Sequence, residues 1–368
     1  MLLPSIVASC YHQPMSATGQ PSVVVGVVPA VLAALFFGAS TPAVKALSTG
    51  GGPNAVAALL YMGSGVGLLL VLLARRARGG TITPIPRAAW SRFSVAIFAG
   101  GVVAPALLVL GLKTTAASTS SLLLNTEGVL TAVIAWVVFR ENVDRRVLLG
   151  MTAIVLGGIA LAFDGGAVVA DVGALFIVGA CAGWAIDNNL TQGVSSADPL
   201  LVASIKGLAA GAVNAIIALV LGQTWGDVDV GAAVLVVGFV GYGVSLSCFV
   251  LALRHLGTAR TGAYFGAAPF VGAALSIAWL GEPVTAGLVV GAVLMLVGLC
   301  LHLTEHHEHE HEHEALDHDH EHVHDEHHQH AHDTGIVVVG AAHSHRHRHA
   351  PLVHGHAHTP DLHHRHTH

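Results

Sequence analysis

Long apolar runs dominate this sequence and restrict the folds that it can adopt. A helix needs about twenty apolar residues to cross the hydrocarbon core of a bilayer, because its backbone polar groups must be satisfied within the segment. Ten runs of this kind follow one another along the chain, at 23–47, 54–73, 93–112, 117–139, 146–163, 172–193, 198–221, 230–253, 260–280 and 285–303. The sequence therefore predicts an all-α integral membrane protein with ten transmembrane helices.

The charged residues divide the chain into parts with different physical properties. Of the 368 residues, 53% are hydrophobic and 10% are charged, whereas soluble domains carry about 25% charged residues. Residues 305–368 contain 24 of the 27 histidines, with twelve acidic residues and three arginines. We expect a disordered leader at 1–22 and a disordered His/Glu-rich tail at 304–368. The four cysteines are widely spaced, which argues against a disulfide framework or a thiolate metal site.

Basic residues between the apolar runs predict the orientation in the membrane. Short loops rich in Lys and Arg tend to stay in the cytoplasm. Three connections on one side of the predicted topology carry arginines: Arg75, Arg76, Arg78, Arg87 and Arg92; Arg140, Arg145 and Arg146; and Arg254 and Arg260. We therefore expect a multi-pass protein of the plasma (inner) membrane with both termini, and the tail, in the cytoplasm.

The sequence contains an internal repeat. At a spacing of 141 residues, 108–161 align with 249–302 without a gap. The matched positions include Lys113 with Arg254, Glu141 with Glu282, Gly150 with Gly291, and Gly157 with Gly298. The repeat predicts two units of five helices, at 23–163 and 172–303. Because five is odd, the second unit would enter the membrane inverted, as in many secondary transporters whose substrate site lies near the midplane.

Four segments of this sequence resemble a known family. They are FFGASTPAVK (36–45), LLLNTEGVLTAVIAWVVFRENVDRRVLLGMTAIVLGG (122–158), WAIDNN (184–189) and AYFGAAPFVGAALSIAWLGEPVTAGLVVGAVLMLVG (263–298). They resemble the EamA-like ten-helix members of the drug/metabolite transporter superfamily. The resemblance implies inverted five-helix halves, cytoplasmic termini and transport, often export, of small metabolites. Many relatives have a proline in the fourth span where this chain has Glu127, whereas Pro269 keeps the proline of the ninth.

Polar residues inside the apolar runs are the candidate substrate-binding or coupling residues. A charge at the bilayer centre costs about 2.5–3.5 kcal/mol on insertion scales, so it usually faces a cavity or a partner. Glu127 and Asn125 lie in the fourth run, Asp187 and Asn188 in the sixth, and Lys206 in the seventh. Asp187 and Lys206 should reach similar depths, where they either form an ion pair or contact a charged substrate. Glu127 either bonds a neighbouring backbone group or serves in substrate binding or proton coupling.

Histidine alternates with carboxylate in the tail, and neutral imidazole is a ligand for zinc, nickel and cobalt. The candidate ligands of one or more of these ions are His307, His309, His311, His313, His318, His320, His322 and His324. The alternative is a solvated chain of mixed charge. HEHEH at 307–311 satisfies the HExxH pattern of zinc peptidases only through this alternation, so we do not interpret it as a catalytic site.

These features favour a secondary transporter for a small organic solute, and the family resemblance implies export. A transition-metal transporter for nickel, cobalt or zinc is the first alternative, although no intramembrane cluster of His, Cys or Met supports a metal path. A metal-sensing membrane protein or enzyme without transport is the second. We expect no enzymatic activity, no required cofactor and no nucleic-acid partner. The expected partners are a small-molecule solute, the lipid bilayer and divalent metal ions at the tail, and a homodimer is left open.

Overall fold

The computed structural model describes residues 23–139, 145–161, 163–164, 167–168, 172–191, 194, 197–303, 308–313, 317–322, 343–348 and 352–357. The predicted leader at 1–22 lies outside these residues. The chain divides into two compact units, Met1–Glu305 and His306–His368.

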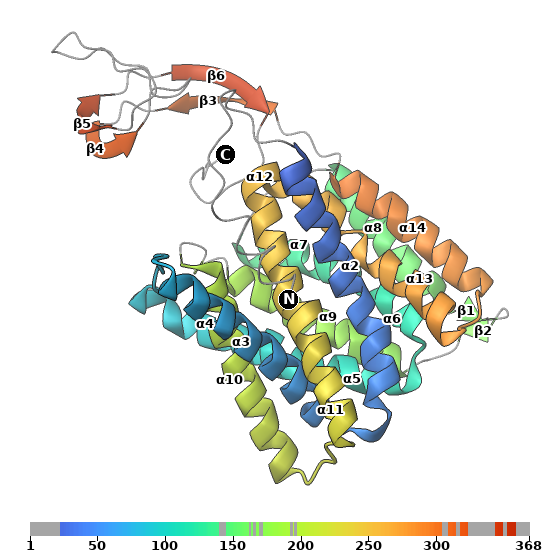
Figure 1. The fold of residues 1–368 in the computed structure, drawn as a ribbon. Helices are drawn as coiled ribbons and strands as arrows, with labels where there is room; N and C mark the ends of the chain where they lie inside the picture. The colour runs from blue at the N-terminus through green and yellow to red at the C-terminus, as the bar shows by residue number, and fades with distance from the viewer. Residues whose placement is uncertain are drawn as a thin grey trace. The chain divides into compact units, whose positions relative to one another are not determined.

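The first unit is a bundle of helices, apart from one short hairpin (Figure 1). Its helical segments are α2 (Val23–Leu47), η1 (Ser48–Gly50), α3 (Pro53–Ala77), η2 (Arg87–Ala89), α4 (Trp90–Ala96), η3 (Ile97–Val103), α5 (Ala104–Thr114), α6 (Ala117–Leu123), α7 (Thr126–Phe139), α8 (Arg145–Leu161), α9 (Val172–Thr191), α10 (Pro199–Val220), α11 (Val228–Val237), η5 (Gly238–Val244), α12 (Ser245–Phe265), α13 (Ala268–Leu280) and α14 (Ala286–Leu303). The strands β1 (Phe163–Asp164) and β2 (Ala167–Val168) pair antiparallel between α8 and α9.

Within the described residues, six helical stretches are long and apolar enough to span a membrane. They are Gly26–Leu47, Pro53–Ala77, Arg87–Thr114, Ala117–Phe139, Pro199–Val220 and Val228–Ala252. Two shorter apolar helices, Ala268–Leu280 and Ala286–Leu301, follow them. The chain is thus a multi-pass, all-helical membrane protein, as the apolar runs predicted.

One predicted connection is wrong. We expected a loop at 254–260, but α12 continues through this segment to Phe265. The segment contains no proline, so nothing removes a backbone hydrogen bond there. The helix is instead interrupted at Gly266 and Ala267, immediately before Pro269 in the first turn of α13. A proline is tolerated at that position because the first N–H groups of a helix lack an intrahelical partner.

Prolines lie at two irregular points of the helices. Pro269 opens α13, and Pro105 follows the π-helical segment η3. Pro42 differs, because α2 continues through it.

Glycines allow several helices to approach closely. A Cβ atom on Gly65 of α3 would lie 2.5 Å from the backbone nitrogen of Leu208 in α10. Gly157 of α8 and Gly291 of α14 are similarly close, since a Cβ on Gly157 would lie 2.9 Å from the Gly291 carbonyl oxygen. Small residues are typical of such contacts in membranes. Gly262 of α12 differs, because a Cβ there would meet no atom within 4 Å.

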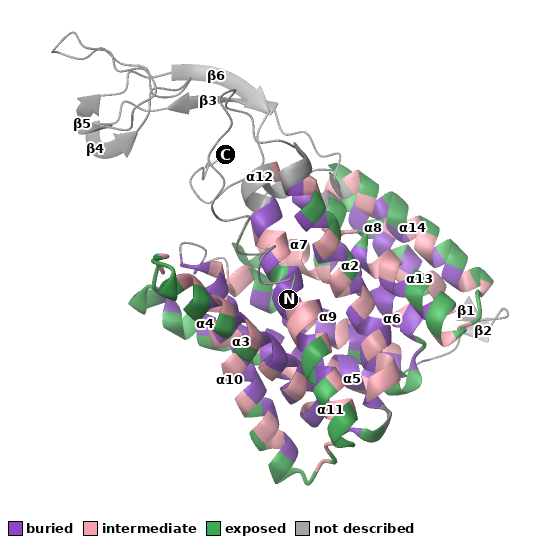
Figure 2. Cartoon of the chain, in the orientation of Figure 1, coloured by how far each residue is buried: buried purple, intermediate pink, exposed green. Residues whose placement is uncertain are grey.

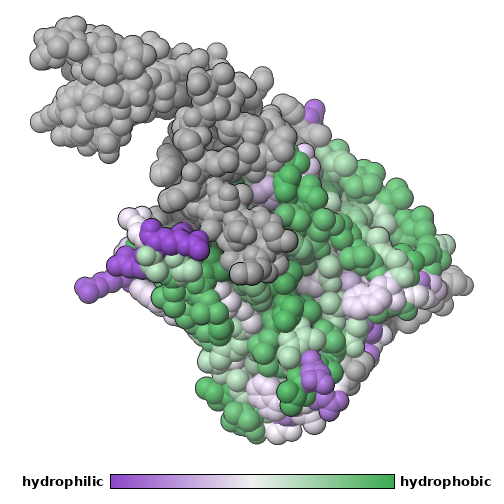
Figure 3. Space-filling view, in the orientation of Figure 1, coloured by the Kyte–Doolittle hydropathy of each residue, from purple (hydrophilic) through white to green (hydrophobic). Residues whose placement is uncertain are grey.

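Apolar side chains fill the interior of the bundle and also cover much of its surface. Phe93, Leu60 and Ile177 are fully buried in the main core cluster, in the purple regions of Figure 2. Large apolar residues such as Val137 and Leu219 are about two-thirds exposed. The face of the bundle seen in Figure 3 is correspondingly hydrophobic over most of its area. Such a surface suits contact with lipid.

Charged side chains form hydrogen bonds and an ion pair between several helix ends. The Lys45 ammonium donates to the backbone oxygens of Leu112 and Thr115, near the end of α5. Arg75 pairs with Asp198, the residue that precedes α10. The Glu282 carboxylate accepts hydrogen bonds from the backbone N–H groups of Ala117 and Ser118, both at 2.7 Å. Glu282 therefore caps the first turn of α6.

The second unit contains four described strands. β3 (Glu308–His313) pairs antiparallel with β6 (Leu352–Ala357), and β4 (Asp317–His322) pairs antiparallel with β5 (His343–Arg348).

Candidate functional site

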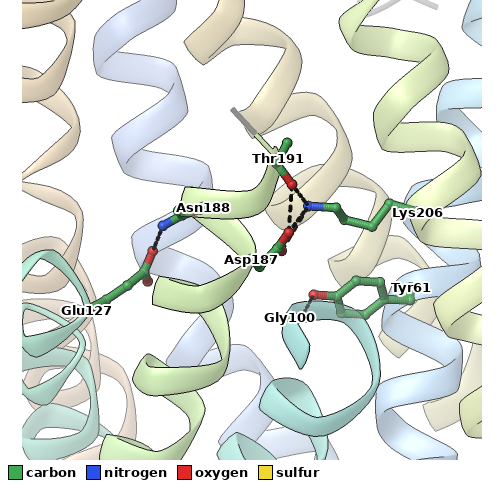
Figure 4. A network of polar contacts seen from close by, with 7 residues as sticks. All are labelled: Tyr61, Gly100, Glu127, Asp187, Asn188, Thr191 and Lys206. Carbon is green, nitrogen blue, oxygen red and sulfur yellow. Dashed lines mark hydrogen bonds and ion pairs between the residues drawn. The ribbon is translucent and has the colours of Figure 1, made fainter. Parts of the chain in front are cut away.

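An ion pair links α9 and α10 inside the bundle. The Lys206 Nζ lies 2.7 Å from Oδ1 and 2.8 Å from Oδ2 of Asp187, and 3.3 Å from the Thr191 Oγ1. The Thr191 hydroxyl also donates to Asp187 Oδ1 at 2.8 Å (Figure 4). The Asp187 side chain is buried, with 7% of its area exposed. The predicted similarity in depth of Asp187 and Lys206 thus corresponds to direct contact.

A second polar contact joins α9 to α7. The side-chain amide of Asn188 donates from Nδ2 to Glu127 Oε1 at 2.8 Å. Consecutive residues of an α-helix point about 100° apart, so Asp187 and Asn188 can face different neighbouring helices. Figure 4 shows this arrangement, with Glu127 on the opposite side of α9 from Lys206. Glu127 is half-buried and Asn188 is exposed, so this part of the cluster is not sealed by protein.

Tyr61 and Gly100 complete the cluster, and neither was predicted from the sequence. The Tyr61 hydroxyl of α3 donates to the Gly100 carbonyl oxygen of η3 at 2.7 Å. A Cβ atom on Gly100 would lie 2.5 Å from the Cγ of Asp187, so the η3 backbone lies directly against this carboxylate. The available signals were a tyrosine hydroxyl that needs a partner in an apolar helix and the adjacent glycines at 100 and 101.

Asn125 does not join the other predicted residues. Its Nδ2 donates to the Leu122 backbone oxygen at 2.9 Å and lies 3.8 Å from the Met295 sulfur. The chain between α6 and α7 is not α-helical at this point, so helical spacing from Glu127 does not predict its direction. The structure therefore groups Glu127, Asn188, Asp187 and Lys206, without Asn125.

A row of aromatic rings extends from Tyr61. The ring of Tyr61 lies 5.9 Å from that of Tyr242, which lies 6.0 Å from Phe37. Phe37 lies 5.3 Å from Phe265, and Phe265 lies 4.8 Å from Phe249. All of these rings except Tyr61 are half-buried. The polar cluster thus adjoins aromatic surface contributed by α2, η5 and α12.

The charges in the cluster determine which ligands it could hold. Asp187 and Glu127 supply two carboxylates and Lys206 supplies one ammonium, with hydroxyl and amide groups beside them. Opposite charges in one site can bind opposite charges on a solute, because each ion removed from water needs a compensating partner.

The predicted metal ligands belong to the second unit. Strand β3 contains His309, His311 and His313, and strand β4 contains His318, His320 and His322. His307 and His324 lie outside the described residues. In the part of the chain that the structure describes, no group of three or more His, Cys, Asp or Glu side chains is arranged to hold a metal ion.

Comparisons with known proteins agree with this architecture. An uncharacterized transporter of Methanothermobacter thermautotrophicus is 27% identical over 290 residues, which cover 74% of this chain and 84% of that protein. A protein of known crystal structure has the same fold, with a TM-score of 0.57 and 17% identity over 76% of this chain and 97% of its own.

A family model gives the most direct assignment. The model of the EamA-like transporter family matches this sequence twice, at residues 24–163 and 171–304. The two matches together cover well over half of the 368 residues. The chain therefore belongs to the EamA-like transporter family.

Proposed function

We propose that this protein is a secondary transporter that exports a small organic solute across the plasma membrane. The observation that carries the proposal is the cluster of Asp187, Lys206, Glu127 and Asn188 within apolar helices. Charged groups are costly at membrane depth, and they usually line the path of a substrate or ion. If Asp187 and Lys206 only held two helices together, no second carboxylate would be needed beside them. Glu127 nevertheless lies close by, in a position that protein does not fully cover.

The composition of the cluster favours a polar organic solute with an apolar part. The two carboxylates of Asp187 and Glu127 and the one ammonium of Lys206 leave an excess negative charge when all three are ionised, and this favours uptake of a proton or of a positively charged group. The adjoining rings of Tyr242, Phe37 and Phe265 could contact the apolar part of the solute. Coupling to protons through Glu127 would then drive transport.

We further propose that the ten predicted spans form two inverted units of five. Element boundaries support the repeat at its spacing of 141 residues. η3 begins at Ile97 and η5 at Gly238, and α8 begins at Arg145 and α14 at Ala286. The α6–α7 interruption at 124–125 likewise corresponds, with a shift of one residue, to the α12–α13 interruption at 266–267.

Contacts between α8 and α14 support the inversion. A Cβ on Gly157 would approach the Gly291 oxygen, and a Cβ on Gly298 would lie 2.6 Å from the Gly150 oxygen. Gly150 corresponds to Gly291 in the repeat, and Gly157 corresponds to Gly298. The repeat therefore converts the contact of Gly157 with Gly291 into the contact of Gly298 with Gly150. This exchange is expected when two equivalent helices pack around a pseudo-two-fold axis. A substrate site near the membrane midplane accords with such a design.

Arginine-rich connections support cytoplasmic termini. Arg75, Arg76 and Arg78 end α3, and Arg145 and Arg146 begin α8. Both groups lie on the same side if the spans alternate, and basic residues favour the cytoplasm. The predicted third arginine loop no longer contributes, because α12 continues through it. Reporter fusions after Glu305 and within 165–170 test the orientation. We expect a cytoplasmic signal at Glu305, and an external signal there would contradict the topology.

We also propose that the histidine tail binds divalent metal ions such as zinc, nickel or cobalt. The backbone register of β4 and β5 supports this, because it pairs His318 with His347, His320 with His345, and His322 with His343. Directly opposed residues of antiparallel strands have Cβ atoms about 4.5–5.5 Å apart. The alternate positions of the register pair Asp317 with Arg348 and Asp319 with Arg346, which are residues of opposite charge.

A growth-toxicity screen tests the transport function. A strain lacking the gene is challenged with amino acids, other metabolites and metal salts, and is compared with the same strain expressing the protein. We expect selective protection against an organic solute, and protection that depends on Asp187. Protection against a metal salt alone would instead favour the metal transporter.

A matched pair of variants makes the screen specific to the site. Asp187→Asn removes one charge of the pair inside the bundle, whereas Asp198→Asn removes the partner of Arg75 at the start of α10. We expect the first variant to insert normally and to lose protection, and the second to retain it. If Asp187→Asn protects as well as the unmodified protein, the proposed site is wrong.

A further inference from the structure

Two side chains from different helices hold the backbone of η3. A π-helical segment has a wider hydrogen-bonding pattern than an α-helix, and such segments are frequent at functional sites. The Gly100 oxygen accepts a hydrogen bond from the Tyr61 hydroxyl of α3 at 2.7 Å. The next carbonyl, that of Gly101, accepts one from Asn214 Nδ2 of α10 at 3.0 Å. Tyr61 is 8% exposed and Asn214 is fully buried.

The segment held in this way lies against the ion pair. The three atoms nearest to a Cβ on Gly100 would all belong to Asp187. On the neighbouring residue, a Cβ on Gly101 would lie 2.6 Å from the Cβ of Ala210 in α10, the helix that carries Lys206. A displacement of η3 would therefore change the space available to the Asp187 side chain and its distance from Lys206.

A chain of amides fixes the orientation of Asn214. Its Oδ1 accepts a hydrogen bond from Asn54 Nδ2 at 3.0 Å, which directs its own NH2 group toward Gly101. Asn54 Oδ1 in turn accepts from Gln223 Nε2 at 3.0 Å. Gln223 Oε1 accepts from the backbone N–H of Asn54 at 2.9 Å. The chain thus extends from the end of α10 and the first turn of α3 to the backbone of η3.

We propose that Tyr61 and Asn214 are positioning residues that hold η3 against Asp187 and thereby set the geometry of the Asp187–Lys206 pair. Neither residue contacts Lys206 or Asp187 through a hydrogen bond in the part of the chain described here, so both act through the η3 backbone. The consequence for transport rests on the proposed function of the pair. The positioning itself is a statement about the strength of one ion pair and can be measured without a substrate.

A double-mutant cycle on the purified full-length protein measures that strength. The free energy of unfolding by SDS is determined for Asp187→Asn, Lys206→Met and the double variant, and the cycle gives the coupling between the two residues. The cycle is repeated in the Tyr61→Phe, Asn214→Ala and Tyr242→Phe backgrounds. Tyr242→Phe is the matched control, because it removes the same hydroxyl from the adjacent ring without touching η3.

We expect the coupling to be lost in the Tyr61→Phe and Asn214→Ala backgrounds and kept in the Tyr242→Phe background. A merely structural role would lower the overall stability and leave the coupling unchanged. Equal coupling in all four backgrounds would overturn the proposal, as would the absence of coupling in the unmodified protein. Tyr61→Phe keeps the ring and so keeps the test informative if Asn214→Ala does not fold.

A transport arm separates this inference from the proposed function. Each variant is expressed in the strain lacking the gene and challenged with the solute selected by the screen. If Asp187→Asn still protects, the proposed function fails, while the cycle independently decides the positioning role. If Asp187→Asn loses protection but Tyr61→Phe and Asn214→Ala protect fully and keep the coupling, the positioning role alone is overturned.

Discussion

Glu127 and Asn125 lie two positions apart and have different surroundings, which makes them a matched pair for mutation. Glu127 bonds Asn188 in the polar cluster, whereas Asn125 bonds the Leu122 backbone oxygen. Glu127→Gln keeps an amide oxygen for Asn188 but removes the charge. Because the amide neither carries the charge nor exchanges a proton, we expect the transport rate to fall by at least about tenfold without loss of insertion. Flux of the solute in whole cells measures this.

Asn125→Ala is the control for that experiment, and it should keep most of its flux. Equal flux in Glu127→Gln and the unmodified protein would leave Glu127 with a structural role only. Equal losses in both variants would indicate that the fourth span responds to any change in its packing.

Individual residues differ in how well the sequence predicts their contacts. The similar depth of Asp187 and Lys206 could be predicted, because consecutive antiparallel helices bring such residues level, but the sequence left open whether they form an ion pair or contact a charged substrate. Asn188 could be assigned to the site but not to a partner, since that depends on which helix packs beside α9. The role of Tyr61 could not be predicted, because its acceptor is a backbone oxygen of the π-helical segment η3.

Helices, like single residues, differ in how well the sequence predicts them. Apolar length predicted the bounds of most helices closely, and Pro269 lies in the first turn of α13 where the helix is interrupted. The π-helical segments could not be predicted, because Ile97–Val103 and Gly238–Val244 contain nothing that distinguishes them from α-helix. The loop expected at 254–260 was wrong for a related reason, since arginines signal a membrane boundary without ending a helix.

Packing between α3 and α10 predicts the effect of a single methyl group. Gly65→Ala would place a Cβ 2.5 Å from the Leu208 backbone nitrogen, so the helices must separate. We expect a loss of about 1–3 kcal/mol in the free energy of unfolding, which is typical of overpacking. Unfolding in SDS, followed by circular dichroism, measures the loss.

Gly262→Ala makes the same change where a Cβ meets no atom within 4 Å. It should be neutral or slightly stabilising, because alanine favours the helix over glycine by about 1 kcal/mol. A similar loss of stability in both variants would contradict the close approach of α3 and α10.

The first turn of α6 depends on a residue far away in the sequence. Glu282 accepts hydrogen bonds from the N–H groups of Ala117 and Ser118, which have no partner within the helix. Glu282→Ala should lower the free energy of unfolding by about 1 kcal/mol, in the range found for helix caps. Glu282→Gln keeps one acceptor oxygen and should lose less. If Glu282→Ala and Glu282→Gln are both as stable as the unmodified protein, the cap does not contribute to folding.

The whole molecule combines a membrane unit that the family model covers with a histidine-rich tail. Removing the tail should separate the functions of the two parts. Truncation after Thr304 retains both family matches in full, so the shortened protein should fold and insert. It should keep transport of the organic solute and lose binding of zinc and nickel.

Metal ions require neutral imidazole, whose ordinary pKa is about 6.5, so binding to the full-length protein should weaken as the pH falls below that value. Calorimetric titration of both proteins with each metal, at about pH 7.5 and about pH 5.5, tests the binding. Absence of heat with the full-length protein at the higher pH would remove the metal role. Loss of all transport on truncation would instead make the tail part of the transport mechanism, because the membrane unit alone would then lack a component that it needs.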